Sequence, residues 1–271
     1  MRLITWNCKG AFHRKHDFVA ALRPDILIVP ECEKVSGVTQ PFNSAPVESF
    51  EWFGSNPRKG LAVISYSDYA LEVHPSYDPR FQWIVPLSVS GPVAFVLFAV
   101  WTLPVGGHAG RYARPLLEAF EFYKSTIDTP EVIWAGDFNS NFVWDKPSRR
   151  YKFCDFVSLL SQRGLHSLYH HQRKCEHGKE PDHTFYHHHN PDKGYHIDYV
   201  FAAERLHPRV IDVFIGSHAE WSKRSDHAPL ICDFLEDESS SNRALQPTTP
   251  AVTLAAPPPS PTSQRASLRR R

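Results

Sequence analysis

Short runs of apolar, often β-branched residues recur along the first 235 residues of this 271-residue chain, and each has the length of a β-strand. Several are continuously apolar, which is typical of strands that are buried on both faces or lie inside a sandwich. Such a pattern indicates sheets that pack face to face. The runs occupy residues 2–8, 25–32, 61–67, 84–89, 93–101, 131–138, 196–203, 210–215 and 228–235.

Helix-like periodicity separates some of these runs, at residues 16–22, 111–127 and 151–163. Gly164 follows the last of these segments, where glycine is typical of a helix end. A chain of 271 residues with 42% hydrophobic content suffices for one large domain. We therefore predict an α/β fold in which helices cover the outer faces of packed sheets.

The composition changes sharply after Asp237. Residues 238–271 contain six prolines, no aromatic residue, and five arginines against one glutamate. Such a segment buries too little apolar surface to offset the entropy of ordering it, so we predict a folded domain over 1–237 and a disordered tail over 238–271. Subtracting the tail's +4 from the chain's +1 leaves −3 for residues 1–237. We expect a solvated tail, with contact to nucleic acid or anionic lipid as the alternative.

The cysteines and the N-terminal sequence bear on cellular location. Five cysteines, odd in number and scattered, fit a reducing compartment better than a disulfide framework. The N-terminal residues lack the apolar region of a signal peptide, and no apolar stretch reaches transmembrane length. We expect a soluble, cytoplasmic monomer without a transmembrane segment.

Polar residues stand at the ends of several strand-like runs. Asp137 and Asn139 come at and after the end of run 131–138, where Gly136 lets the backbone bend. A carboxylate beside an amide can hold a water molecule, since the carboxylate accepts its proton and the amide orients it. The alternative is an ordinary turn, because Gly-Asp-x-Asn is rich in turn-forming residues.

Asp226 and His227 precede the last run. A histidine at this position can stabilise negative charge on a phosphate or act as an acid or base. Asp198 lies within an apolar run, and a carboxylate is rarely buried without a partner. We expect Asp198 to orient His227, with a solvent-facing aspartate on an edge strand as the alternative.

Glu31 comes at the end of run 25–32, and Asn7 near the end of the first run. A lone carboxylate at a strand end suits Mg²⁺, which takes one or two protein carboxylates and keeps its waters for a substrate phosphate. Glu33 can compete for this role. Asn7 can bond a phosphate oxygen or a metal-bound water. A surface glutamate and a turn asparagine before Gly10 are the alternatives.

Taken together, these motifs resemble the endonuclease/exonuclease/phosphatase superfamily, which includes DNase I-like nucleases, abasic-site endonucleases and inositol polyphosphate 5-phosphatases. The resemblance spans about residues 1–235 and implies a four-layered α/β/β/α sandwich with two packed mixed β-sheets. The motifs, in the order and spacing of the family, are Thr-Trp-Asn at 5–7, Pro-Glu at 30–31, Gly-Asp-Phe-Asn at 136–139, His-Ile-Asp-Tyr at 196–199 and Ser-Asp-His at 225–227.

The resemblance also implies a chemistry, which is Mg²⁺- or Mn²⁺-dependent hydrolysis of a phosphate ester by a directly attacking water. Each motif then takes a role. The implied roles are metal binding by Glu31 with Asp226, proton abstraction or water positioning by Asp137 with help from Asn139, phosphate contact by Asn7, and transition-state stabilisation by His227, which Asp198 orients.

Two positions depart from the family pattern. Lys9 stands where some abasic endonucleases have an acid, which removes a carboxylate from the implied metal site, and we expect Lys9 to contact phosphate. Trp101 ends the strand that in many members ends in histidine or tyrosine. An indole N–H donates a hydrogen bond but does not transfer a proton at useful pH, so stabilisation of the leaving group has to differ.

Further candidate substrate contacts lie near these motifs. Thr184 falls where related nucleases keep a small polar residue, Asn141 extends the Gly-Asp-Phe-Asn motif, and Trp144 and Tyr151 can stack on a base. The cations that can contact phosphate, each of which is also typical of a solvated surface, are Arg58, Lys59, Arg111, Arg114, Lys146, Arg149 and Arg150.

Histidines cluster late in the domain, where nine of the 16 lie between His166 and His196. One interpretation is a zinc site formed by Cys175, His177, His183 and a later histidine. These spacings match no standard zinc module and include a single cysteine. We therefore expect a polar loop at the rim of the pocket, followed by a strand in which residues 187–189 alternate between faces.

We expect this chain to be a metal-dependent nuclease that acts on nucleic acid. A phosphatase or phosphodiesterase of a small nucleotide or phospholipid headgroup is the alternative, because a domain with a net charge of −3 has no broad field that attracts DNA. A non-catalytic binding protein on the same fold is disfavoured, because the acids, the amides and the imidazole of the motifs are all present.

Overall fold

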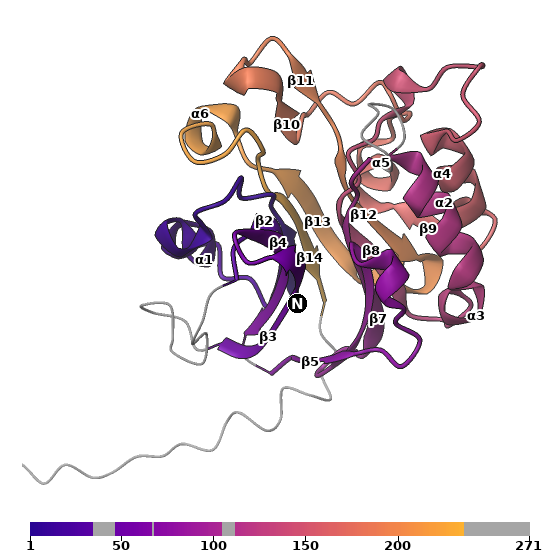
Figure 1. The fold of residues 1–271 in the computed structure, drawn as a ribbon, viewed down its shortest axis with the longest axis horizontal. Helices are drawn as coiled ribbons and strands as arrows, with labels where there is room; N and C mark the ends of the chain where they lie inside the picture. The colour runs from indigo at the N-terminus through magenta and orange to yellow at the C-terminus, as the bar shows by residue number, and fades with distance from the viewer. Residues whose placement is uncertain (35–46, 67, 105–111, 236–271) are drawn as a thin grey trace, which may run out of the picture. The chain divides into compact units, whose positions relative to one another are not determined.

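The computed structural model describes residues 1–34, 47–66, 68–104 and 112–235. Within these ranges two six-stranded sheets pack face to face, and helices cover their outer faces (Figure 1). The predicted four-layered sandwich with two mixed sheets is thereby confirmed. Arg111 and the predicted tail lie outside the described residues. None of the described helices is long and apolar enough to cross a membrane.

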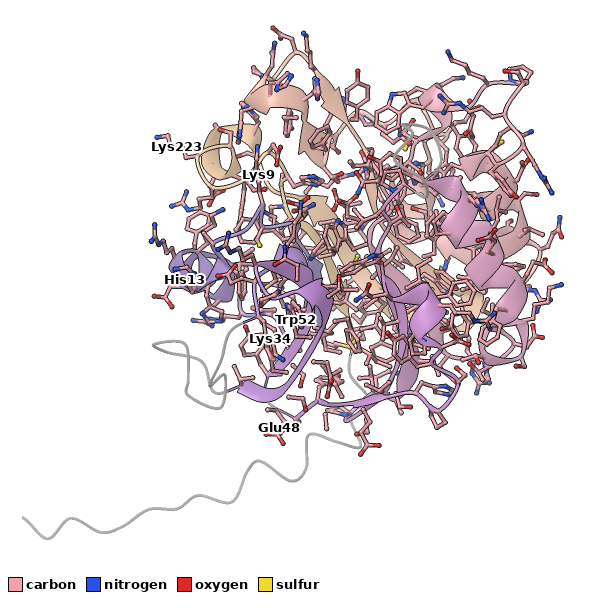
Figure 2. All side chains as sticks on the ribbon, viewed as in Figure 1. Lys9, His13, Lys34, Glu48, Trp52 and Lys223 are labelled. Carbon is pink, nitrogen blue, oxygen red and sulfur yellow. The ribbon has the colours of Figure 1, made fainter. Side chains whose placement is uncertain are left out.

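The first sheet brings together the two ends of the described chain. Strands β1 and β2 run parallel, and the other neighbours are antiparallel. Its strands, in spatial order, are β13 (Val210–Ile215), β14 (Leu230–Phe234), β1 (Arg2–Thr5), β2 (Ile26–Cys32), β4 (Lys59–Tyr66) and β3 (Val47–Asn56). On β3, Trp52 lies under the Lys34 ammonium at 5.6 Å (Figure 2).

The second sheet contains the central part of the chain. Here β7 and β8 are parallel, while the other pairs are antiparallel. Its strands, in spatial order, are β5 (Ala70–Val73), β6 (Ile84–Ser90), β7 (Phe95–Trp101), β8 (Val132–Asp137), β12 (Asp198–Ala203) and β9 (Leu165–Ser167). A separate two-stranded ribbon pairs β10 (Phe185–Tyr186) with β11 (Gly194–Tyr195).

The main core fills the space between the sheets, with fully buried Leu, Ile and Val side chains from both. Two further apolar clusters lie on the outer faces, under the helices, which explains why the strands read as continuously apolar. The helices α1 (His16–Ala20) and α6 (His218–Trp221) flank the first sheet, and α2 (Ala113–Phe122), α3 (Lys124–Ile127) and α4 (Phe153–Ser161) cover the second (Figure 1).

Three local expectations were wrong. The single helix predicted over 111–127 is two helices, α2 and α3, which meet at Tyr123. The loop predicted after 168 begins with a helix, α5 (Leu168–Arg173). Residues 187–189 form a 3₁₀ turn, because His188 and His189 take left-handed backbone angles of 56° and 57° in φ, so they do not alternate between faces.

Strand direction brings the predicted site residues to one edge of the sandwich. Parallel strands of one sheet end at the same edge, and their antiparallel neighbours begin there. Thus β1, β2, β7 and β8 end where β4, β12 and β14 begin. Side-chain bonds between residues of the two sheets, such as that between Asn7 and Asp137, show that the two edges meet.

Candidate active site

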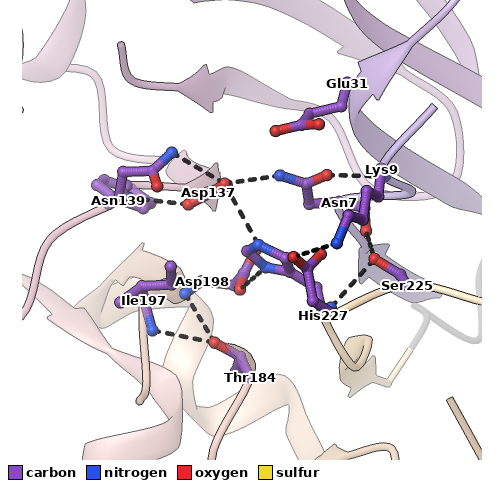
Figure 3. Close-up of polar contacts among 12 residues, drawn as sticks. Asn7, Lys9, Glu31, Asp137, Asn139, Thr184, Ile197, Asp198, Ser225 and His227 are labelled. Carbon is purple, nitrogen blue, oxygen red and sulfur yellow. Dashed lines mark hydrogen bonds and ion pairs between the residues drawn. The ribbon is translucent and has the colours of Figure 1, made fainter. Parts of the chain in front are cut away.

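Asp137 lies at the centre of this edge, at the end of β8. Gly136 before it has φ of +146°, and a Cβ there would lie 1.9 Å from the carbonyl oxygen of Val100, so only glycine fits. The Asp137 carboxylate is fully buried. It accepts hydrogen bonds from Asn7 Nδ2 at 2.9 Å, from Asn139 Nδ2 at 3.0 Å and from the Asn139 backbone N–H at 2.8 Å (Figure 3).

His227 faces Asp137 from the other sheet's side of the site. Its Nδ1 lies 2.9 Å from Asp198 Oδ2, and its Nε2 lies 4.0 Å from Asp137 Oδ2 (Figure 3). Asp198 and Asp137 are direct cross-strand partners on β12 and β8. Two carboxylates in such a pair repel one another, and the imidazole between them offsets the repulsion. The predicted pairing of Asp198 with His227 is therefore present.

Ser225 fixes the position of this histidine, and the sequence analysis gave it no role. Its hydroxyl donates to the Asn7 carbonyl at 2.7 Å and accepts from the His227 backbone N–H at 3.0 Å. It thus connects the segment after β1 to the segment before β14. A small hydroxyl residue two positions before a histidine was the available signal, because such residues commonly bond nearby backbone groups.

The electrostatics of the pair follow from burial and charge. Burial raises the pKa of Asp137 to about 7, and the negative charge of Asp198 adds to the rise. Burial lowers the pKa of His227, but the charge and the hydrogen bond of Asp198 outweigh it and raise that pKa to about 9. Near neutral pH the site therefore holds a carboxylate able to accept a proton opposite an imidazolium cation.

Two residues predicted to contact substrate make hydrogen bonds within the protein. Thr184 is fully buried, and its hydroxyl accepts from the backbone N–H groups of Ile197 and Asp198 at 3.0 Å each. Asn141 is 2% exposed, and its side-chain amide donates to the His196 carbonyl at 2.8 Å and to Glu180 at 3.2 Å. Both side chains hold β12 and its flanking loop. Asn141 also belongs to the lining of the cavity beside Asn139, and contact of either residue with substrate stays a prediction.

Glu31, Lys59 and Trp101 form a chain of contacts at the ends of β2, β4 and β7. The Lys59 ammonium lies 3.0 Å from Glu31 Oε2 and 5.3 Å from the Trp101 ring. Glu31 has a left-handed backbone with φ of 61°, a strained geometry that is common at functional sites. Trp101 is 2% exposed, and its ring packs against Lys59 and its neighbour Trp83.

Lys9 and Asp226 form a second ion pair beside Asn7, whose side-chain oxygen accepts a hydrogen bond from the Lys9 backbone N–H at 3.0 Å. The Lys9 ammonium lies 2.8 Å from Asp226 Oδ2 and 3.1 Å from His189 Nε2. Figure 2 shows Lys9 near α6. Burial opposes ionisation of Asp226, but the bonds from Lys9 and the charge of His227 outweigh it and lower its pKa. The Lys9 side chain is 45% exposed, which leaves its ammonium accessible to a phosphate.

The donors at this edge fit a hard divalent cation. Glu31 and Asp226 are partly exposed carboxylates, with side-chain exposures of 23% and 17%, and carboxylate oxygens are the ligands that Mg²⁺ and Mn²⁺ prefer. Each pairs with a lysine, so a cation that binds there has to release an ammonium group. Asp137 is less suited to hold the metal, because its carboxylate already accepts three hydrogen bonds.

A cavity of about 610 Å³ adjoins Asn139. Aromatic side chains form much of its lining, and the tilted rings of Trp144 and Tyr195 have centroids 4.9 Å apart. Lys146 and Arg149, both predicted as phosphate contacts, belong to the same lining. By contrast, Arg114 is paired with Glu118 on α2. The cavity is large enough for one nucleotide-sized group beside the proton-accepting Asp137.

The sequence was compared with models of known protein families. The model of the endonuclease/exonuclease/phosphatase family matches residues 4–227, most of the chain. The chain belongs to this family. Membership of the endonuclease/exonuclease/phosphatase family supports a hydrolytic enzyme of the nuclease or phosphatase kind. A search of curated protein sequences returned no match.

Several solved nucleases have the same fold. An AP endonuclease from Archaeoglobus fulgidus is 18% identical, with a TM-score of 0.61 over 86% of this chain and 99% of that one. A 3′-5′ exonuclease from Neisseria meningitidis is also 18% identical, with a TM-score of 0.62 and the same coverage. An AP endonuclease from Leishmania major is 14% identical, with a TM-score of 0.64 over 87% and 88%. At these identities the similarity shows the fold.

Proposed function

We propose that this chain is a divalent-metal-dependent nuclease that hydrolyses phosphodiester bonds of nucleic acid by a directly attacking water. The observation that carries the proposal is the arrangement of Asp137, held by Asn7 and Asn139, opposite His227 at the edge where both sheets meet. A hydrolase that forms no covalent intermediate needs a group that takes the water's proton and a cation that meets the developing charge, and this pair supplies both.

In the proposed reaction Asp137 accepts the proton of the attacking water, and the Asn139 amide helps to fix the water's position. The His227 imidazolium donates a hydrogen bond to a phosphate oxygen as negative charge accumulates there. Asp198 keeps that imidazole protonated and correctly turned. Asn7 and the ammonium groups of Lys9 and Lys59 are the remaining candidates for contact with the phosphate.

Glu31 would hold Mg²⁺ or Mn²⁺, with Asp226 as the second carboxylate. When bound, such an ion neutralises phosphate charge and stabilises the leaving oxygen. The lysines that pair with these carboxylates in its absence would then be released toward the phosphate, where a flexible ammonium acts as a point charge. In this way Lys9 and Lys59 compensate for the histidine or tyrosine that Trp101 replaces.

Two observations support a small phosphoester as the alternative substrate. The cavity beside Asn139 is lined by aromatic rings and accommodates a single nucleotide-sized group. Residues 1–237 also carry a net charge of −3, which does not favour long polyanions. The structural neighbours are two AP endonucleases and a 3′-5′ exonuclease, which favours nucleic acid.

A substrate panel tests the proposal. It contains single- and double-stranded DNA, abasic DNA, RNA, bis(p-nitrophenyl) phosphate and inositol phosphates, each with Mg²⁺, Mn²⁺ or EDTA. Asp137→Asn should lower turnover by at least about 1,000-fold with little change in substrate affinity, because it removes the proton acceptor but keeps the shape. Asp155→Asn, which alters an exposed carboxylate on α4, is the matched control.

The outcomes separate the hypotheses. Metal-dependent cleavage of a polynucleotide that Asp137→Asn abolishes supports the nuclease, and its rate should then fall steeply with salt. Activity on small esters alone, with a shallow salt dependence, supports the alternative substrate. A protein that hydrolyses no phosphate ester with either metal would be a binding protein on this fold.

A further inference from the structure

A second group of metal-ligating side chains lies apart from the candidate active site. His170 on α5 and His177 and Glu180 in the segment that follows have ligand atoms within 4.8 Å of one another. Their rings pack near Tyr199 and Phe201, which point to the face of β12 opposite to Asp198, because side chains alternate along a strand. The group is therefore separated from the catalytic edge by the sheet itself.

Two ring nitrogens, one in this group and one beside it, are buried without a hydrogen-bond partner among the described residues. They are His177 Nδ1 and Nε2 of His196, whose ring centroid lies 5.4 Å from that of His170. A buried polar atom without a partner is costly and calls for an explanation, of which an absent ion is one. Burial also lowers the pKa of both imidazoles to about 3, so each ring is neutral near pH 7 and has a free lone pair.

The remaining contacts resemble those that surround bound metals. The Ser167 hydroxyl lies 2.7 Å from His170 Nδ1, which leaves Nε2 directed at Glu180, 3.0 Å away. Burial opposes ionisation of Glu180, but bonds from His170 and the Gly178 N–H outweigh it and lower its pKa to about 2. A carboxylate that stays ionised and a histidine whose second nitrogen is fixed by a hydroxyl are what a transition-metal site requires.

We propose that His170, His177 and Glu180 bind a transition-metal ion of the Zn²⁺ type. Imidazole nitrogens favour Zn²⁺ over Mg²⁺, so this site is distinct in both place and metal from the carboxylates at the catalytic edge. Cys175 and His183, which the sequence analysis considered as zinc ligands, do not belong to the group. The sequence did not predict this set of ligands, because His170 lies on a helix, α5, that the sequence did not indicate.

Binding requires one local movement. The rings of His170 and His177 are stacked, with centroids 3.6 Å apart and planes 20° apart, whereas a metal ion has to lie near the plane of each ring it binds. His177 therefore rotates when the ion enters. Its Nδ1 has no hydrogen bond to lose, and Gly178 beside it has φ of +85°, in the region that glycine adopts freely.

The site would hold the segment between α5 and β10 against the second sheet. Glu180 connects this segment to Asn141, whose amide also bonds the His196 carbonyl next to β12. Asn141 follows Asp137 and Asn139 closely in sequence. A bound ion would thus stiffen the loop that carries the water-holding amide, although the ion itself takes no part in the chemistry.

The test measures Zn²⁺ binding by the full-length chain after EDTA treatment and dialysis, by calorimetry in excess Mg²⁺ and by the absorption spectrum of the Co²⁺-loaded protein. We expect one Zn²⁺ per chain. His177→Phe keeps an aromatic ring in the stack but removes its donors, and should weaken binding by more than about 100-fold, since loss of mere outer-shell partners costs 10–100-fold. His171→Phe, at the exposed neighbour on α5, is the matched control and should change affinity less than about threefold.

Two further variants locate the ion. Glu31→Gln should leave Zn²⁺ binding intact, because it alters only the catalytic edge, and so should H187N/H188N/H189N, which removes the exposed histidine turn. The proposal is overturned if no stoichiometric Zn²⁺ binds, if His177→Phe binds it as tightly as the original chain, or if affinity disappears with either of these two variants. None of these readouts depends on phosphoesterase activity, so the proposed function can fail while this site stands.

Discussion

Asp198 controls the charge of His227, and the substitution Asp198→Asn isolates this effect. The neighbouring carboxylate raises the pKa of the buried imidazole from 6.5 to about 9, which corresponds to about 3 kcal/mol. Asparagine keeps the shape but removes the charge, so burial is opposed only by the charges of Asp137 and Asp226, and the pKa of His227 should fall. A return to the ordinary value of 6.5 would lower the protonated fraction of His227 at pH 8 roughly 30-fold, and the loss of orientation should cost roughly another tenfold.

The pH profile of kcat/KM measures this directly. In the original chain activity should rise through about pH 7, as Asp137 loses its proton, and fall through about pH 9, as His227 loses its own. In Asp198→Asn both limbs should move to lower pH, because the Asp198 charge raises both pKa values. The substrate is bis(p-nitrophenyl) phosphate at a fixed saturating metal concentration. Each reaction is quenched in base before the absorbance of p-nitrophenolate is read, so that the ionisation of the product does not affect the pH profile.

A basic limb of Asp198→Asn that stays near pH 9 would show that His227 is not the titrating acid. Movement of the two limbs in opposite directions would contradict a charge of Asp198 that raises both pKa values. Asp155→Asn should show the profile of the original chain. Titration of the His227 ring protons by NMR, compared between the two chains, assigns the basic limb to this residue independently of turnover.

Three further predictions follow from the same geometry. Gly136→Ala should destabilise the domain by about 3 kcal/mol or more, lowering Tm by roughly 6–12 °C in calorimetry, because its Cβ would overlap the Val100 carbonyl; an unchanged Tm would contradict that packing. Truncation after Asp237 should leave Tm and turnover of a minimal substrate unchanged, and a large loss of either would refute a passive tail. Lys9→Asp should tighten Mn²⁺ binding and raise KM, since a carboxylate replaces the cation beside Asp226; calorimetry and kinetics that show neither change would remove Lys9 from the phosphate site.

The nine apolar runs predicted as strands are all present, because a strand covered on both faces has to be apolar at every position, whereas the strand predicted over 187–189 is a 3₁₀ turn. The missed strands lack the apolar signal. β3 is half-exposed along most of its length, β5 and β9 have only four and three residues, and β10 and β11 have two each. An apolar sequence pattern reveals strands whose side chains are buried. It does not reveal an edge strand that hydrogen-bonds to its neighbour but buries few side chains.

The candidate site was predictable in part, for the same reason. Residues at strand ends, such as Asn7, Glu31 and Asp137, meet because strand direction forces them to one edge. The roles of Asn141 and Thr184 depend instead on which backbone groups nearby lack partners, and a sequence does not contain that information. The left-handed backbone of Glu31 was equally invisible, because its cause lies in the irregular pairing of β2 with β4 around this residue.

The distribution of charge over the site bears on how the chain departs from the family pattern. Four carboxylates, Glu31, Asp137, Asp198 and Asp226, face three cations, Lys9, Lys59 and His227. A lysine in place of an acid weakens the field that attracts a metal ion but strengthens the field that attracts phosphate. The site should therefore depend on substrate to complete its metal coordination, and metal and substrate should each tighten the binding of the other.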